Sequence, residues 1–263
     1  MKKPTWVIEK ERARRASAAE TVWLFGLHAV RDALLNPARE KLRLVLTKNA
    51  LGRLEDAVAA SGLEPEVVDA RKFNLPLDPG SVHQGAALEV KPLQWGGLDG
   101  VLDPSNSSPV IVALDRVSDP QNAGAILRSS EVFGASAVIA PFRHSAPEIG
   151  ALAKSASGAL ERQPYLRVKN LGNSLLDLKD RGFVVLGLEG TSETEISSKV
   201  QTVAGPLVLV LGAEGPGLRE RTKSLCDFLV RIGPAGGFGS LNVSNAAAVA
   251  LYSVFAARRP PKA

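Results

Sequence analysis

The sequence has a single cysteine, Cys226, among 263 residues, which excludes an intrachain disulfide and any metal site built from several cysteines. It lies in the apolar stretch SLCDFLV, so we expect a buried structural thiol rather than a nucleophile. Histidine is also scarce, with three residues and no two of them at a ligand spacing. We therefore expect no zinc site and no other resident metal.

Long hydrophobic runs are absent as well. No stretch approaches the length that spans a membrane, and residues 1–20 lack the apolar core of a secretory signal. That segment is charged and polar, so we expect a flexible basic tail. Its glutamates, Glu9, Glu11 and Glu20, argue against an organellar presequence. These absences favour a soluble, cytoplasmic protein.

Apolar residues make up 45% of the chain, which is enough for a substantial core, and the net charge is +5. A modest basic excess is compatible with a polyanionic partner, but many proteins that bind no nucleic acid share it. Seven basic residues in the first third of the chain are candidate phosphate contacts, although a solvated surface charge is the simpler explanation of each. They are Arg31, Arg39, Lys41, Arg43, Lys48, Arg71 and Lys72.

The chain alternates short apolar runs with amphipathic segments, which predicts an α/β protein. Residues 21–92 predict a small domain with strands at 43–47, 66–70 and 86–90 and helices at 27–35 and 51–60. Residues 93–107 are rich in Gly, Pro and Ser and predict a linker. Residues 108–263 predict a larger domain with a mostly parallel sheet. Its predicted strands are 110–115, 136–140, 165–168, 183–189, 206–212 and 229–232, and its main helices are 121–133, 171–182 and 241–259.

Three segments of the larger domain place polar residues beside glycines at strand ends. In the first, residues 114–134, DPQN starts a helix and Gly124 permits close backbone approach. Asn122 and Arg128 are six positions apart, so they lie on different helix faces unless Asn122 belongs to the loop. For either residue alone, a helix cap at Asn122 and a surface charge at Arg128 are the simpler explanations.

In the second segment, residues 207–220, a strand runs into a loop with Gly212, Gly215 and Gly217. Loops at the carboxyl ends of parallel strands are where α/β proteins bind ligands. The order GxxGxG is not the dinucleotide fingerprint, and no Lys-Ser or Lys-Thr pair follows, which argues against NAD and against a P-loop. Glu214 would repel phosphates, so the loop suits a cationic or hydroxyl-bearing ligand.

In the third segment, residues 231–252, a glycine-rich turn leads through Ser-Leu-Asn-Val-Ser into an alanine-rich helix. Taken alone, Ser240 or Asn242 is explained as the N-cap of that helix. In this order, however, the three segments resemble the three-motif signature of the SpoU (TrmH-like) RNA ribose methyltransferases, over residues 110–258. The matching positions are Asn122, Gly124 and Arg128; Leu211, Gly212, Glu214 and Gly217; and Ser240, Leu241, Asn242, Val243 and Ser244.

The front part has a resemblance of its own. GLHAVRDALL and HQGAALEVKPL are similar to the RNA substrate-binding domain of the SpoU subgroup that methylates a guanosine in 23S rRNA. Together the resemblances imply a knotted SPOUT-type (α/β-knot) methyltransferase domain behind a small α/β RNA-binding domain. They also imply S-adenosylmethionine as methyl donor, 23S rRNA as substrate, and a homodimer with its active site near the interface.

The resemblance also assigns residues. The donor would be held by Leu211, Gly212, Gly217, Ile232 and Leu241. The catalytic pocket would be lined by Asn122, Arg128, Glu214, Ser240 and Asn242. The family usually has Ile-Pro-Met before the third motif, whereas this chain has Ile-Gly-Pro-Ala at 232–235. That departure affects donor affinity rather than chemistry, because it removes no reactive group.

The proton of a ribose 2′-hydroxyl must be removed or its oxyanion stabilised, yet the three motifs contain no histidine. Arg128 is the family's proposed base, although the guanidinium of arginine is normally protonated and is therefore a poor base. Arg128 either takes the proton with the help of a nearby phosphate or stays charged and stabilises the alkoxide, and we favour the second role. Asn122 and Asn242 would orient the ribose, Ser240 would position the hydroxyl or a phosphate, and Glu214 would hold its loop.

The predicted reaction is therefore methyl transfer from S-adenosylmethionine to a ribose 2′-hydroxyl of RNA. The front domain favours a guanosine of 23S rRNA over the tRNA substrates of family members without such a domain. A non-catalytic RNA-binding or ribosome-assembly protein on this scaffold is the alternative from another class. The complete set of polar motif residues argues against it.

Overall fold

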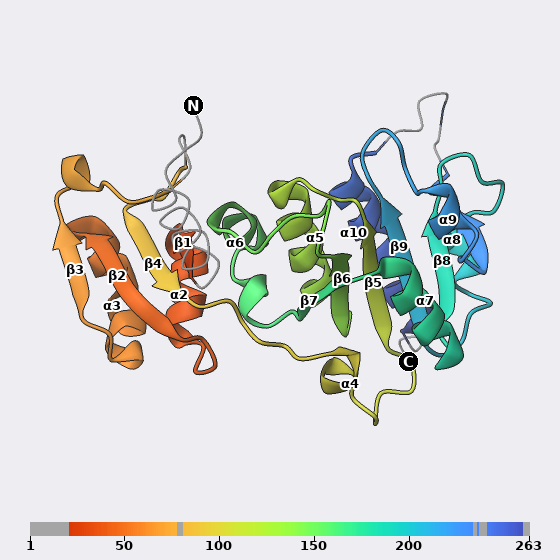
Figure 1. Cartoon of the computed structure of the whole chain (residues 1–263), viewed down its shortest axis with the longest axis horizontal. Helices are drawn as coiled ribbons and strands as arrows, with labels where there is room; N and C mark the ends of the chain where they lie inside the picture. Colours follow the sequence, from red (N-terminus) through yellow and green to blue (C-terminus); the bar gives the residue numbers. More distant parts are fainter. Residues whose placement is uncertain (1–20, 78–80, 234–235, 237–240, 260–263) are drawn as a thin grey trace, which may run out of the picture. The chain divides into compact units, whose positions relative to one another are not determined.

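The computed structural model describes residues 21–77, 81–233, 236 and 241–259. The tail expected over residues 1–20 lies outside these residues. The chain forms two compact units (Figure 1), which we call the front unit and the large unit. The front unit contains the described part of residues 1–94 together with 148–161, and the large unit contains the rest. One linker at 93–107 was expected, whereas the chain passes between the units at three places.

A four-stranded sheet in the order β1-β4-β2-β3 forms the centre of the front unit. Strand β4 pairs antiparallel with β1 and with β2, whereas β3 runs parallel to β2. Strand β1 was not predicted from the sequence. The elements are β1 (Val22–Phe25), α2 (Leu27–Leu35), β2 (Lys41–Thr47), α3 (Lys48–Ser61), β3 (Pro65–Val68), the 3-10 turn η1 (Ala70–Lys72), β4 (Ala86–Val90), α6 (Gly150–Ala156) and the 3-10 turn η2 (Ala159–Glu161).

The turn before β4 joins two helices of the front unit. The Oε1 atom of Gln84 accepts a hydrogen bond from the backbone N–H of Leu27 at 3.1 Å and so caps α2 from outside. Gly85 has a φ of 76°, and a Cβ there would lie 2.3 Å from Oγ1 of Thr47, which caps α3. Only glycine fits this position. This close packing explains why His-Gln-Gly precedes the strand.

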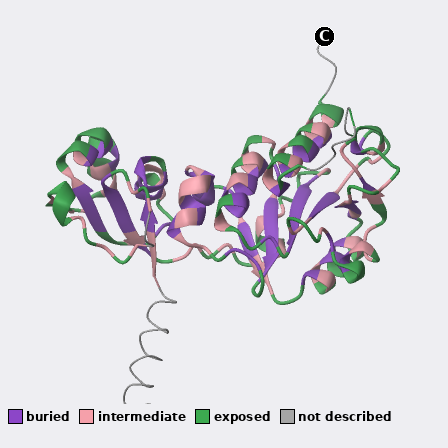
Figure 2. Cartoon of the chain, turned by 90° about the horizontal axis from the view of Figure 1, so that it is seen from above, coloured by how far each residue is buried: buried purple, intermediate pink, exposed green. Residues whose placement is uncertain are grey.

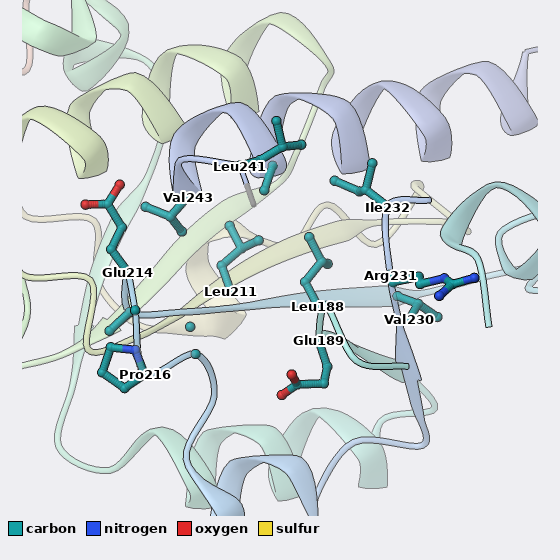
Figure 3. Close-up of a pocket in the computed structure, with 16 residues that line it drawn as sticks. Leu188, Glu189, Leu211, Glu214, Pro216, Val230, Arg231, Ile232, Leu241 and Val243 are labelled. Atoms are coloured by element: carbon teal, nitrogen blue, oxygen red, sulfur yellow. The ribbon is translucent and has the colours of Figure 1, made fainter. Parts of the chain in front are cut away.

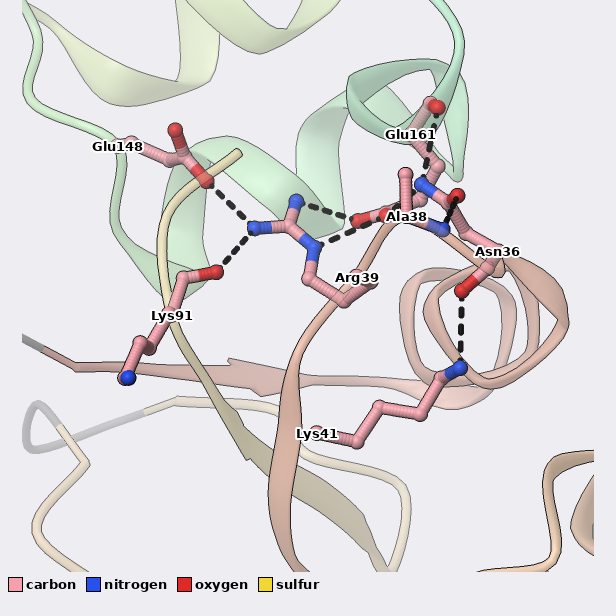
Figure 4. A network of polar contacts seen from close by, with 7 residues as sticks. All are labelled: Asn36, Ala38, Arg39, Lys41, Lys91, Glu148 and Glu161. Atoms are coloured by element: carbon pink, nitrogen blue, oxygen red, sulfur yellow. Dashed lines mark hydrogen bonds and ion pairs between the residues drawn. The ribbon is translucent and has the colours of Figure 1, made fainter. Parts of the chain in front are cut away.

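A buried ion-pair network holds residues 148–161 in the front unit (Figure 4). The Arg39 side chain is 0% exposed and donates to the Glu161 carboxylate from Nε at 3.0 Å and from Nη2 at 2.7 Å. Its Nη1 donates to Glu148 Oε1 at 3.0 Å and to the carbonyl of Lys91 at 2.8 Å. Asn36 adds a hydrogen bond to Glu161 at 2.9 Å. As a buried structural cation, Arg39 is neither the phosphate contact nor the solvated surface charge that the sequence suggested.

The large unit contains a six-stranded sheet in the order β10-β8-β9-β5-β6-β7, and every neighbouring pair is parallel. The expected parallel α/β sheet is confirmed. The elements are α4 (Leu98–Val101), β5 (Val110–Asp115), α5 (Pro120–Val132), β6 (Ala137–Pro141), β7 (Tyr165–Val168), α7 (Leu171–Asp180), β8 (Val184–Leu188), α8 (Ile196–Lys199), β9 (Leu207–Gly212), α9 (Glu220–Lys223), β10 (Phe228–Val230) and α10 (Val243–Arg258).

Helices cover both faces of this sheet, and the strands between them are buried (Figure 2). On one face α7 packs Leu171, Leu175 and Leu178 against alternate residues of β5, β6 and β9. Helices α5 and α10 pack against each other, and α10 also contacts β9. Burial on both faces explains the continuous apolar runs in the sequence, since an exposed face would require alternation. No helix within the described residues is long and apolar enough to cross a membrane.

Candidate active site

A cavity of about 390 Å³ opens at the carboxyl ends of β8, β9 and β10 (Figure 3). Ligands of parallel α/β proteins bind at this edge, where loops leave the strands. All five residues that the sequence assigns to the donor line this cavity. The lining residues are Leu188, Glu189, Gly190, Leu211, Gly212, Ala213, Glu214, Gly215, Pro216, Gly217, Val230, Arg231, Ile232, Leu241, Val243 and Ala246.

The loop after β9 folds back on its own strand. The backbone N–H of Gly217 donates to the carbonyl of Ala213 at 3.0 Å, and Gly215 and Gly217 have left-handed φ values of 82° and 70°. A Cβ on Gly212 would lie 2.2 Å from the carbonyl carbon of Gly217. The glycines therefore let the loop return close enough to the strand to form one wall of the cavity.

The cavity combines apolar walls with two carboxylates. Leu188, Leu211 and Ile232 face it from three strand ends (Figure 3), while Glu189 and Glu214 supply the acidic groups. Lys223 bonds Glu189 at 2.7 Å and holds the pKa of that carboxyl below its usual range. Arg231 also lines the cavity, so two carboxylates face one cation, and these walls suit a ligand that has an apolar planar part together with hydroxyl groups or positive charge.

Three of the predicted catalytic residues meet beside the cavity. Asn242 donates from Nδ2 to Oδ1 of Asn122 at 2.9 Å and also to Oε1 of Glu214. Its own Oδ1 accepts from the N–H of Ser244 at 2.9 Å, so Asn242 is the N-cap of α10 as well. The suggested capping role of Asn122 is wrong, because Asp119 caps α5 and Asn122 lies buried inside the first turn. The three motifs are thus connected through side chains far apart in sequence.

Arg128 and Ser240 stand apart from this cluster. Arg128 lies on α5 with an exposed side chain, does not line the cavity, and has no hydrogen-bond or ion-pair partner among the described residues. Ser240 lies outside the described residues, as do Pro234 and Ala235 of the segment that departs from the family pattern. The predicted roles of Arg128 and Ser240 stay predictions.

Two contributions to the site are absent from the sequence-based expectation. Leu188 and Glu189 reach the cavity from the end of β8, a strand that carries no motif. The predicted strand itself could have indicated these residues, because β8 runs parallel to β9 and its carboxyl end therefore lies at the same edge of the sheet. Asp115 is 0% exposed, and its carboxylate accepts a hydrogen bond from Nε of Arg219 at 2.7 Å. This bond anchors the segment after the glycine loop to β5.

Cys226 is partly buried, and its thiol donates to the carbonyl of Thr222 at 3.3 Å. Burial, reinforced by the charge of Asp227, raises the pKa of this thiol to about 11. A thiol that stays protonated at neutral pH is a poor nucleophile, which agrees with the structural role expected for it. Within the described residues, no group of three or more His, Cys, Asp or Glu side chains is arranged to hold a metal ion.

Comparison with known proteins supplies independent evidence. Residues 109–252 match the SpoU rRNA methylase family, and residues 23–96 match the RNA 2′-O ribose methyltransferase substrate-binding domain. The 23S rRNA (guanosine-2′-O-)-methyltransferase RlmB of Pseudomonas putida is 40% identical over 242 residues, covering 90% of this chain and 96% of that protein. RlmB of Haemophilus influenzae is 36% identical over 240 residues, covering 88% and 96%.

Solved structures show the same fold. The SpoU methyltransferase AviRb from Streptomyces viridochromogenes, in complex with AdoMet, has a TM-score of 0.77 at 23% identity and covers 92% of each chain. An AdoMet-bound rRNA methyltransferase from Sinorhizobium meliloti has a TM-score of 0.71 at 21% identity, covering 94% of this chain and 92% of that one. With a family match over more than half its length and relatives that match it almost end to end, this chain belongs to the SpoU rRNA methylase family.

Proposed function

We propose that this protein transfers a methyl group from S-adenosylmethionine to the ribose 2′-hydroxyl of a guanosine in 23S rRNA. The family and the RlmB relatives support the reaction and the substrate. The observation that carries the proposal is the position of the Asn122–Asn242–Glu214 cluster directly beside the cavity. A donor site and a set of groups able to orient a hydroxyl then share one edge of the sheet.

The cavity passes a test of fit for this donor. The loop after Gly212 forms one wall of the cavity, because the absence of a Cβ at Gly212 lets the Gly217 backbone return against the strand. Leu188 and Ile232 offer apolar surface for a purine, and the carboxylate of Glu189 can accept hydrogen bonds from ribose hydroxyls. Leu211, Gly212, Gly217, Ile232 and Leu241 would hold the donor; Glu189 is an addition to that set.

When bound, S-adenosylmethionine supplies an activated methyl group on a sulfonium cation. The protein must then align the ribose oxygen and manage its proton. Asn242 is held in place by Asn122 and Glu214, so its amide is preorganised at the mouth of the cavity. In this proposal Arg128 acts as a cation that stabilises the developing alkoxide electrostatically. Ser240 would position the hydroxyl or a neighbouring phosphate.

We propose further that the active site is completed in a homodimer. Arg128 does not line the cavity of its own chain, and it shares one face of α5 with Val132, which is 66% exposed. On α10, which packs against α5, Val249 and Tyr252 are 41% and 57% exposed. An apolar surface around an unpaired arginine supports self-association there. A knot in the large unit and a cytoplasmic location are also part of this proposal, and the ribosomal RNA substrate of the relatives supports the location.

The test is methylation mapping. Purified protein is incubated with labelled S-adenosylmethionine and unmodified 23S rRNA or tRNA, and ribose methylation is located by resistance to alkaline cleavage. One protected linkage in 23S rRNA, lost with Arg128→Ala while donor binding by calorimetry is unchanged, is the expected result. Label in tRNA alone would overturn the substrate. Neither transfer nor donor binding would favour the non-catalytic RNA-binding alternative.

A further inference from the structure

The loop after β6 exposes an aromatic ring and a cation side by side. Phe142 is 60% exposed, which is unusual for a phenylalanine, and Arg143 and His144 after it are exposed as well. His144 has a left-handed φ of 60°, a conformation that a non-glycine residue holds only when its surroundings enforce it. The contacts of this loop therefore show whether other residues hold the Phe142 ring in its exposed position.

Arg167 of β7 fixes the loop from below. Its guanidinium donates to the carbonyls of Ala146 at 2.8 Å, Pro141 at 3.0 Å and Phe142 at 3.0 Å, and to Oγ of Ser145 at 2.9 Å. The Arg167 guanidinium carbon also lies 5.9 Å from the centroid of the Phe142 ring. The Arg167 side chain therefore makes hydrogen bonds at both ends of the loop. These bonds fix the position of Phe142 before any ligand binds.

The loop is also bonded to the strands on both sides. The N–H of Phe142 donates to the carbonyl of Val168 at the end of β7, at 2.9 Å, and the N–H of Ala146 donates to the carbonyl of Val117 after β5, at 3.0 Å. These bonds bring the exits of β5, β6 and β7 together. Arg116 leaves β5 and Lys169 leaves β7 at this same edge, and both are exposed.

The charge at this edge is free to meet a ligand. Arg116, Arg143 and Lys169 have no carboxylate partner among the described residues, unlike the exposed pairs of Arg31 and Arg43 with Asp56 and Glu66. Residues 21–94 have as many acidic as basic residues, so this segment has no net charge. An exposed ring flanked by unpaired cations is the arrangement that binds single-stranded nucleic acid, through base stacking and phosphate contacts.

The edge is the one that carries the cavity. Asp115, the last residue of β5, pairs with Gly212 of β9, and Gly212 lines the cavity. Arg116 follows Asp115 directly, so it lies between the cavity and the loop after β6. We propose that the residue 141–146 loop is an RNA-binding platform, in which Phe142 stacks on an unpaired base near the target nucleotide and Arg116, Arg143 and Lys169 contact the flanking phosphates. Arg167 is the positioning residue of this platform. The proposal rests on RNA being the substrate of the site.

The test measures binding of the full-length protein to a fluorescein-labelled, unstructured 12-nucleotide RNA by anisotropy at several salt concentrations. Phe142→Leu keeps an apolar side chain but removes the ring, and should weaken binding on the order of 5- to 100-fold, whereas Phe142→Trp should restore it. Arg143→Ala should lower the slope of log affinity against log salt by about 0.7, the value for one single-strand phosphate contact. Arg259→Ala removes the same charge at the end of α10 and should leave both quantities unchanged.

Arg167→Lys tests the positioning role. If Arg167 acts through the loop, the Phe142→Leu/Arg167→Lys double variant should bind RNA no more weakly than Phe142→Leu, while calorimetric donor affinity stays unchanged in all variants. Unchanged RNA binding in Phe142→Leu, or equal loss with Trp and with Leu, overturns the platform. If the wild type methylates 23S rRNA and Phe142→Leu has the same KM for that RNA, the platform is refuted while the proposed function stands. Ring-dependent RNA binding without any methyl transfer by the wild type would instead refute the proposed function.

Discussion

Replacing Arg39 by methionine should destabilise the front unit strongly, because it removes a buried cation that pairs with the buried carboxylate of Glu161 and the partly buried carboxylate of Glu148. The side chains of Arg39 and Glu161 are 0% and 3% exposed, and that of Glu148 is 14% exposed. Methionine fills a similar space, so the change isolates charge and hydrogen bonding from packing. Glu161 would keep only the hydrogen bond from Asn36 at 2.9 Å, and Glu148 would lose its ion pair.

Breaking a buried ion pair by removing one partner costs about 3–5 kcal/mol, since the remaining charge is desolvated and uncompensated. For a unit of this size each kcal/mol lowers the thermal midpoint by roughly 4–8 °C. We therefore expect the transition of the front unit to fall by about 12 °C or more. Differential scanning calorimetry measures the shift, and the fluorescence of Trp23 in β1, recorded in a Trp95→Phe background because Trp95 belongs to the large unit, assigns it to the front unit.

The matched control is Arg43→Met in the same sheet. Arg43 also makes a two-point pair with a glutamate, Glu66, at 2.7 and 2.8 Å, but both side chains are about half exposed. Water and salt screen that pair, so its loss should change the midpoint little. Adding Glu161→Gln to Arg39→Met should recover much of the lost stability. An Arg39→Met shift no larger than that of Arg43→Met would refute the reasoning.

Four further predictions concern the candidate active site, the Arg39 ion-pair network and Cys226. Gly212→Ala should abolish donor binding in calorimetry, because its Cβ would lie 2.2 Å from the Gly217 backbone; retained affinity would show that the loop yields. Asn242→Asp keeps the helix cap but replaces the amide donor with a second carboxylate beside Glu214, so methyl transfer should fall at least tenfold in a variant that circular dichroism shows to be folded at the assay temperature, and unchanged methyl transfer would contradict a catalytic role. Burial raises the pKa of Glu148, so its contribution to stability is full below its unfolded pKa of about 4.3 and is lost as pH rises through the raised value. The stability of the wild type relative to Glu148→Gln, from urea unfolding, should therefore fall from pH 4 to pH 7, and a pH-independent difference would count against it. With a pKa of about 11, Cys226 should react with iodoacetamide at pH 8 far more slowly than a free thiol, and rapid labelling of folded protein would contradict its burial.

The sequence by itself determined the strands of the large sheet and the position of the glycine loop that follows β9. Apolar runs such as 110–115 and 206–212 are local signals, and their length and flanking residues were enough to predict β5 and β9 almost to the residue. Parallel strands must place their carboxyl ends at one edge, so the glycines after β9 were expected at the site where the cavity lies. The three motifs identified the family because they are a local pattern too.

Only the tertiary structure decided which polar groups meet and which charges are buried. Asn122 and Asn242 are 120 positions apart, and no spacing rule brings their amides to 2.9 Å. Arg39 looks in the sequence like six other candidate surface cations, yet its pairing with Glu161 removes it from solvent. Phe142 is one more apolar residue until Arg167 is seen to hold it outward. Periodicity records the neighbours of a residue along its own element, whereas burial and pairing depend on neighbours from other elements, which the fold alone supplies.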